Sequence, residues 1–168
     1  MNTRKMTILA ILLALNVVVS FFYITVGANL RIYFTFLINM MIAANYSYPV
    51  VLLYAVVEDL VSFFVYPTGP FFAGYTLTAV ISLTLYWLFL HRKVDLLHVT
   101  LAKISVNLIA NVLVNSYWSY LLYGKAYMYY LSKSIVKNVL LIPVEVALFI
   151  LFHKLVQPLF DRYENRSQ

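Results

Sequence analysis

Three asparagines recur at intervals of four residues inside a long apolar stretch: Asn107, Asn111 and Asn115. In a helix this spacing keeps the side chains on neighbouring faces, with a drift of about 40° per step. Amide groups carry both hydrogen-bond donors and acceptors, so the row could match the edge of a polar heterocycle. The alternative is structural, because such side chains also join membrane helices at about 0.6–2 kcal/mol per contact. Trp118 and Tyr117 follow the row, so that ligand binding and a structural role both stay open.

Five charged residues also fall inside apolar stretches, where each costs about 2.5–3.5 kcal/mol if it lies at a bilayer centre. Glu145 is expected to pair inside the helical bundle, whereas Lys103 lies only about 6 Å from the end of its stretch and could snorkel to the surface. Lys137 could snorkel or point toward an anion in a pocket. Glu58 and Asp59 complete the set.

Other chemistries find little support. The chain has no cysteine, and its three histidines are not spaced as metal-ligand pairs, so no metal site or cofactor is expected. It has neither a phosphate-binding G-x-x-x-x-G-K-[ST] loop nor a G-x-S-x-G nucleophile motif. Its 12 basic residues form no stripe, which argues against nucleic acid. We therefore expect no enzyme activity, and ATP hydrolysis could come only from a partner.

The composition identifies the elements that must position these residues. Of 168 residues 64% are hydrophobic and 11% charged, against about 45–50% and 25% in soluble proteins. A soluble chain of this size could not bury so much apolar surface. The sequence predicts an all-α polytopic protein in a lipid bilayer.

Charged residues, prolines and glycines divide the chain into six predicted transmembrane helices. The expected ranges are 6–26, 32–45, 49–65, 75–90, 99–122 and 134–155. A full span needs about 20 residues, so the second range is short. Because the connections are tight, the whole of 1–168 is expected to be one membrane domain.

Basic residues in the connections predict the orientation. With six spans and an inside N-terminus, seven basic residues fall on the inner side and three on the outer side, namely Arg31, Lys125 and Lys133. The positive-inside rule then predicts that both termini are inside.

The predicted outer loops are 27–31, 66–74 and 123–133, and they contain all four glycines. Pro67 and Pro70 fix φ, and Gly69 between them permits a tight turn, so the 66–74 loop is expected to be shaped. A structured aromatic loop over a bundle favours a pocket open to the outer face. For Tyr127, Tyr129 and Tyr130 an interfacial aromatic belt is the favoured interpretation.

The order of several motifs resembles the substrate-binding S components of energy-coupling factor (ECF) vitamin transporters, and more narrowly the folate-specific FolT group. The resemblance covers about residues 6–156. It rests on Leu30-Arg31-Ile32, the string YPTGPFFAGYTLT at 66–78, Lys103 with Asn107, Leu122-Tyr123-Gly124, and Lys137-Asn138 followed by Pro143 and Glu145.

The resemblance implies that the chain captures folate or reduced folates from outside a bacterial cell membrane. A coupling membrane protein and two ATPase subunits would then drive uptake. Ala10 and Ala14, a small-xxx-small motif in the first helix, would contact the coupling protein. The implied substrate-binding residues are Arg31, Tyr66, Thr68, Phe71, Tyr75, Asn107, Asn111, Trp118, Tyr123, Lys137 and Asn138.

Folate chemistry suits this set, because a pteridine could stack on an aromatic ring and its glutamate tail could meet Arg31 or Lys137. Two alternatives remain open. One is an S component for riboflavin, thiamine or pantothenate. The other is a membrane assembly protein without a transport role, whose polar residues only join helices.

Overall fold

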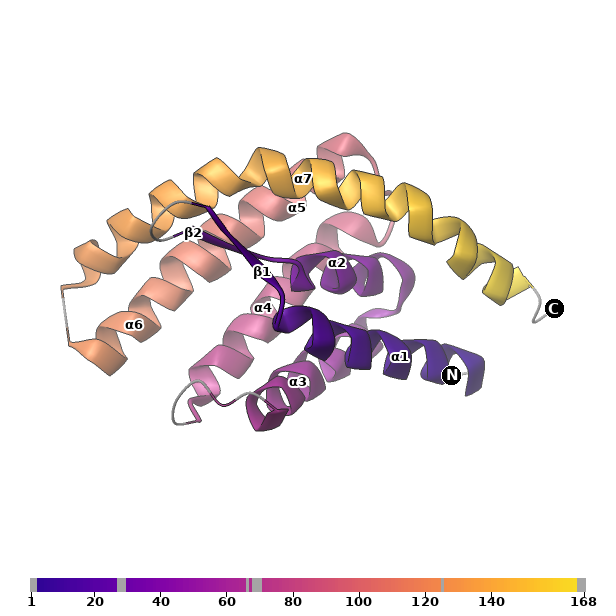
Figure 1. The fold of residues 1–168 in the computed structure, drawn as a ribbon, viewed down its shortest axis with the longest axis horizontal. Coiled ribbons are helices and arrows are strands. Elements are labelled where there is room, and N and C mark those ends of the chain that lie inside the picture. The colour runs from indigo at the N-terminus through magenta and orange to yellow at the C-terminus, as the bar shows by residue number, and fades with distance from the viewer. Residues whose placement is uncertain (1–2, 27–29, 66, 68–70, 125, 166–168) are drawn as a thin grey trace.

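The fold is a bundle of helices that also contains a short β-hairpin (Figure 1). The computed structural model describes residues 3–26, 30–65, 67, 71–124 and 126–165. The elements are α1 (Thr3–Ser20), β1 (Tyr23–Val26), β2 (Leu30–Tyr33), α2 (Thr35–Asn45), α3 (Tyr48–Val65), α4 (Ala73–Leu90), α5 (Leu96–Ser105), the π-helix η1 (Val106–Val114), α6 (Asn115–Tyr123) and α7 (Tyr127–Asn165).

Within the described ranges, five helical segments are long and apolar enough to cross a membrane: α1, α3, α4, α7 and the continuous 28-residue run Leu96–Tyr123 formed by α5, η1 and α6. Helix α2 is apolar but has only 11 residues. The chain is therefore a multi-pass membrane protein with five or six apolar helices. The predicted orientation stays a prediction.

The short helix α2 lies at the centre of the bundle, packed against α1, α4 and α7. Its residues Met40, Met41, Ile42 and Ala43 are fully buried. A helix surrounded by protein need not match the thickness of the lipid, because its ends are covered by neighbouring elements instead of hydrocarbon. This central position explains why the second predicted helix, 32–45, can be shorter than a full membrane span.

The first predicted span is too long, and the all-helical prediction misses a hairpin. Helix α1 ends at Ser20, and Tyr23–Val26 pairs antiparallel with Leu30–Tyr33, residues that the sequence assigned to the first and second spans and the loop between them. The rings of Tyr23 and Tyr33 lie opposite each other, 5.6 Å apart. Aromatic and β-branched residues favour such pairing over helix.

The last helix is much longer than predicted. It runs over Tyr127–Asn165 and arches across the bundle (Figure 1). Most of the predicted outer loop 123–133 is therefore helical, and only a short connection after Gly124 (φ +68°) joins α6 to α7. Pro143 and Pro158 lie inside α7, where a proline removes one backbone hydrogen bond and bends the helix.

Asp95 begins the long run Leu96–Tyr123 as the N-cap of α5. Its carboxylate accepts a hydrogen bond from the backbone N–H of His98 (2.8 Å) and contacts Nδ1 of the same residue (2.6 Å). These bonds hold the pKa of Asp95 below its ordinary value, and the bond from the backbone N–H contributes most. The cap fixes the start of the helix that carries the asparagine row.

Candidate functional site

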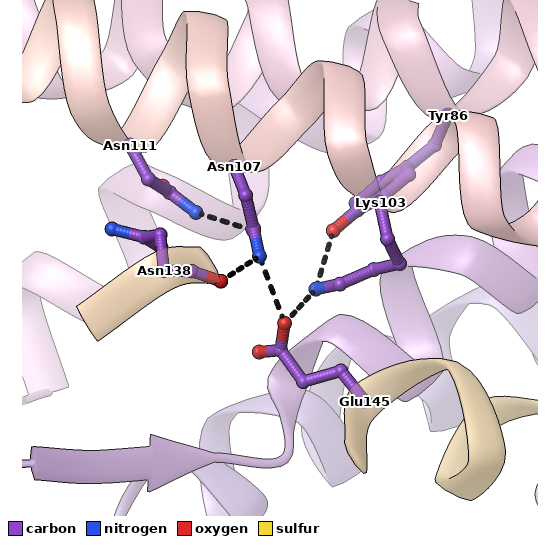
Figure 2. A network of polar contacts seen from close by, with 6 residues as sticks. All are labelled: Tyr86, Lys103, Asn107, Asn111, Asn138 and Glu145. Carbon is purple, nitrogen blue, oxygen red and sulfur yellow. Dashed lines mark hydrogen bonds and ion pairs between the residues drawn. The ribbon is translucent and has the colours of Figure 1, made fainter. Parts of the chain in front are cut away.

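A buried ion pair joins α5 to α7. Nζ of Lys103 lies 2.9 Å from Oε2 of Glu145, and the same Nζ donates to the hydroxyl of Tyr86 on α4 over 3.3 Å (Figure 2). Lys103 is 2% exposed, and its ammonium also lies 4.3 Å from the centre of the Phe36 ring on α2. The pairing expected for Glu145 is confirmed. Lys103, which could have snorkelled to the surface, does not, because its partners lie inside the bundle.

The asparagines extend this ion pair into a network (Figure 2). The Asn107 amide donates to Glu145 Oε2 (3.0 Å) and to the backbone carbonyl of Asn138 (3.3 Å). Its own oxygen accepts from Asn111 (3.1 Å). Asn107 has both donors and its acceptor engaged and is 1% exposed. It therefore anchors the helices, whereas the half-buried Asn111 lies at the edge of the network.

The local backbone explains this convergence. Pro143 has no N–H for the carbonyl of Val139, so α7 departs from regular helix close to Asn138. On the helix that faces α7, Asn107 and Asn111 lie in η1, whose i→i+5 hydrogen bonds make a wider turn than an α-helix, and Asn115 begins α6. Such π-helical turns occur often at functional sites. The spacing of four therefore brings Asn107 and Asn111 together in a geometry different from the expected α-helix.

Aromatic side chains cluster where α4 begins and α6 runs beside it. The Phe72 ring packs edge-on against Trp118 (5.3 Å between ring centres) and against Tyr75 (5.6 Å). Nε1 of Trp118 donates to Thr78 Oγ1 over 3.0 Å, which fixes the indole. Gly74 is buried beneath Phe72, and a Cβ there would collide with the ring. The cluster offers flat apolar surface for an aromatic ligand.

Two buried polar atoms close to Trp118 in the sequence have no hydrogen-bond partner among the described residues. They are Oδ1 of Asn115 and Oγ of Ser116. A buried polar group without a partner costs about 1–3 kcal/mol, and buried polar groups in proteins are usually paired. These atoms could be satisfied by a ligand beside α6.

A second polar cluster joins α1, α2 and α3. The Asn16 amide nitrogen lies within 2.9 Å of Asn39 Oδ1, 2.9 Å of the Tyr54 hydroxyl and 3.2 Å of Glu58 Oε1. Nearby on α3, Asp59 accepts a hydrogen bond from Thr76 of α4 over 2.6 Å. Each intramembrane acidic side chain of α3 is thus hydrogen-bonded to another helix. These contacts support a structural role for this pair.

The predicted substrate-binding residues do not all meet. The structure brings Asn107, Asn111 and Asn138 into one network and packs both Trp118 and Tyr75 against Phe72. Phe71 packs on Phe63 and is half exposed, and Tyr123 is 67% exposed near Tyr130. Lys137 precedes Asn138 on α7 and is half-buried.

Three predicted residues cannot be placed in full. Tyr66 and Thr68 lie outside the described residues. Arg31 belongs to β2, paired with Thr25, but its side chain is outside the described part of the chain. The predicted docking residues Ala10 and Ala14 lie exposed on α1. No cluster of three acidic or histidine side chains that could hold a metal occurs within the described ranges.

Sequence reasoning missed Phe72, Thr78, Tyr86 and Phe36. Phe72 and Thr78 belong to the string at 66–78, so its two successive phenylalanines were a usable signal. Tyr86 and Phe36 carried none, because a single aromatic residue in an apolar helix looks the same whether or not it contacts a lysine.

Comparisons with known proteins give one family. The chain is 33% identical over 156 residues to the folate transporter FolT of Leuconostoc mesenteroides subsp. mesenteroides, covering 88% of this chain and 83% of that protein. It is 28% identical over 88 residues to the folate transporter FolT of Clostridium novyi, covering 52% and 51%. No protein-family model matches.

A solved structure agrees in fold. The crystal structure of FolT bound with folic acid superposes with a TM-score of 0.78 at 25% identity, over 89% of this chain and 92% of that one. Similarity in sequence and in fold thus extends over most of both chains. The chain belongs to the FolT family of folate transporters, the family that its motifs resemble.

Proposed function

We propose that this chain is the folate-binding subunit of a membrane transporter and that it binds folate between α4, the α6 end of the long helix, and α7. The observation that carries the proposal is the fold shared with a FolT structure holding folic acid. The aromatic cluster of Phe72, Tyr75 and Trp118 supports the same place, because it offers a surface on which a pteridine could stack.

Polar groups on η1 and at the start of α6 suit the edges of a pteridine. Asn111 is half-buried, and Asn115 Oδ1 and Ser116 Oγ have no partner among the described atoms. Asn107 is less available, since a ligand could reach it only by replacing a bond to Glu145, Asn138 or Asn111. The dianionic glutamate tail would meet Arg31 of the hairpin or Lys137 of α7.

Transport itself would need other subunits. We propose that α1 docks on a coupling membrane protein served by two ATPase subunits, in a bacterial cell membrane. The exposed Ala10 and Ala14 lie one turn apart and leave room for close approach by another helix. A chain of this type would bind its vitamin without ATP and release it inside only when coupled.

Isothermal titration of the detergent-purified chain tests the binding proposal. Folate should bind with a stoichiometry of one, and riboflavin, thiamine and pantothenate should not compete. Arg31→Ala should raise the Kd for folate about 10- to 150-fold, because a charge-assisted hydrogen bond contributes about 1.5–3 kcal/mol. Pteroate lacks the glutamate, so its Kd should hardly change.

Arg92→Ala is the matched control, because Arg92 is exposed beyond the end of α4 and should leave both ligands unaffected. Equal losses for folate and pteroate in Arg31→Ala would mean that Arg31 holds the hairpin and not the tail. Displacement of folate by another vitamin would contradict the proposed substrate.

A further inference from the structure

An apolar groove of about 650 Å³ runs between α5 and α7, on the part of the bundle away from the aromatic cluster. Pro143, Ala147, Leu151 and Lys154 line it along one face of α7, and Leu96 and Thr100 line it from α5. Ala147 leaves the groove open because its side chain is small. The groove shares no lining residue with the proposed folate site.

The length of the groove matches one leaflet of a bilayer. Pro143 and Lys154 are eleven residues apart on α7, which corresponds to about 16 Å along the helix axis. The hydrocarbon core of a bilayer is about 30 Å thick, so one leaflet contributes about 15 Å. An acyl chain lying in the groove would extend from the headgroup layer to about the midplane.

Positive charge lies at one end of the groove. Lys154 is exposed there and has no hydrogen-bond or ion-pair partner within the described ranges. Arg92 and Lys93 are exposed in the connection that leads to Leu96. The acidic residue of that connection, Asp95, is already engaged by His98. Lys154, Arg92 and Lys93 outnumber Asp95, so an anionic headgroup would meet a net positive charge.

We propose that this groove binds one anionic phospholipid, with an acyl chain against Ala147 and the phosphate beside Lys154. A phospholipid fits both features at once, since the apolar groove accepts the chain and the cation accepts the headgroup. The site would tie α5 to α7 from outside, on the same two helices that the Lys103–Glu145 pair joins inside.

Native mass spectrometry of the purified chain with dioleoyl phosphatidylglycerol and dioleoyl phosphatidylcholine tests the site. The wild type should bind one phosphatidylglycerol more tightly than phosphatidylcholine. Lys154→Gln should weaken phosphatidylglycerol about fivefold, because a basic side chain near an anionic surface contributes about 1 kcal/mol. Lys154→Arg should keep that affinity. Ala147→Phe should weaken both lipids about tenfold by occupying the chain site.

Arg162→Gln and Val144→Phe are the matched controls, because they make comparable changes, loss of a basic side chain and gain of a ring, on α7 at positions that do not line the groove. Both should bind lipid as the wild type does, and all variants should bind folate. Equal effects of Lys154→Gln and Arg162→Gln would overturn the headgroup contact. Competition by inorganic phosphate alone would indicate an ion site and overturn the lipid. Loss of coupled uptake in Ala147→Phe without loss of lipid would indicate a protein partner instead.

Discussion

At the scale of single residues, the central feature is a lysine and a glutamate buried together in a membrane bundle. Lys103 and Glu145 satisfy each other, and Tyr86 and Asn107 supply the remaining hydrogen bonds. Removing one member of a buried pair leaves an uncompensated charge, which is far more costly than removing both. The pair therefore links α5 to α7 only as long as both residues are present.

Lys103→Met should lower the free energy of unfolding by about 3–5 kcal/mol, because it leaves the Glu145 carboxylate buried without its counter-ion. The double substitution with Glu145→Met should recover most of the loss. Thermal unfolding in detergent measures both. Lys93→Met, at an exposed position, should change stability by about 0.5 kcal/mol or less. If Lys103→Met lowered the free energy of unfolding as little as Lys93→Met does, the buried ion pair would be contradicted.

Gly74→Ala should weaken folate binding about two- to tenfold while the protein still folds. The added methyl collides with Phe72, whose ring must leave its edge-on contact with Trp118, and such a contact contributes about 0.5–1.5 kcal/mol. Titration with folate checks the prediction, and Trp118 fluorescence reports the movement. Ala73→Ser adds one heavy atom at the neighbouring exposed position and should be neutral. Unchanged affinity in Gly74→Ala would exclude Phe72 from the site.

At the scale of elements, three departures from a regular transmembrane helix coincide with candidate functional features. The π-helix η1 carries Asn107 and Asn111, and Pro143 interrupts α7 beside Asn138 and Glu145. The hairpin that replaces the end of the first predicted span carries Arg31. Helix α1 differs from these elements. It is regular and largely exposed, with few residues in the core.

Ala10→Trp or Ala14→Trp should abolish coupled folate uptake and leave folate binding nearly intact. Both positions are exposed on α1, so a bulky ring disturbs no packing within the chain but blocks close approach of a partner helix. Uptake by proteoliposomes containing the coupling subunits checks this, with folate titration of the same variants as the binding control. Ile11→Trp is the matched control, because it places the same ring at a neighbouring exposed position on α1. Normal uptake in both alanine variants would refute docking through this face.

At the scale of the whole molecule, the bundle is built around α2, the short helix with the most deeply buried residues. Around it the long helices present apolar surface outward, as a bilayer requires. Among the described residues, the buried ion pair belongs to a cluster on α4, α5, η1 and α7, and Asn16 belongs to another on α1, α2 and α3. The proposed folate site lies beside the first of them.

The purified chain should bind folate tightly in the absence of ATP and should not accumulate it in liposomes. ATP-dependent uptake should appear only after the coupling protein and both ATPases are added, because this sequence has no nucleotide-binding loop. Radiolabelled folate uptake with and without these subunits measures the difference. ATP-driven uptake by the chain alone would refute the proposed division of labour.

The sequence by itself determined the features that depend on composition and on local pattern. Apolar content identified a membrane bundle, and the motif order from Leu30 to Glu145 indicated the FolT group, which the relatives confirm. The short second helix was also visible, because its length follows from charges and turns in the chain.

Only the tertiary structure decided which polar residues meet. The sequence left open whether Lys103 snorkels or pairs. It pairs because of Glu145 and Tyr86, which lie 42 and 17 residues away in the sequence, on other helices. The hairpin and the π-helix were likewise hidden, because a short apolar run fits a strand or a helix and no local pattern distinguishes a π-helix from an α-helix. Long-range contacts of this kind leave no periodic trace in a single sequence.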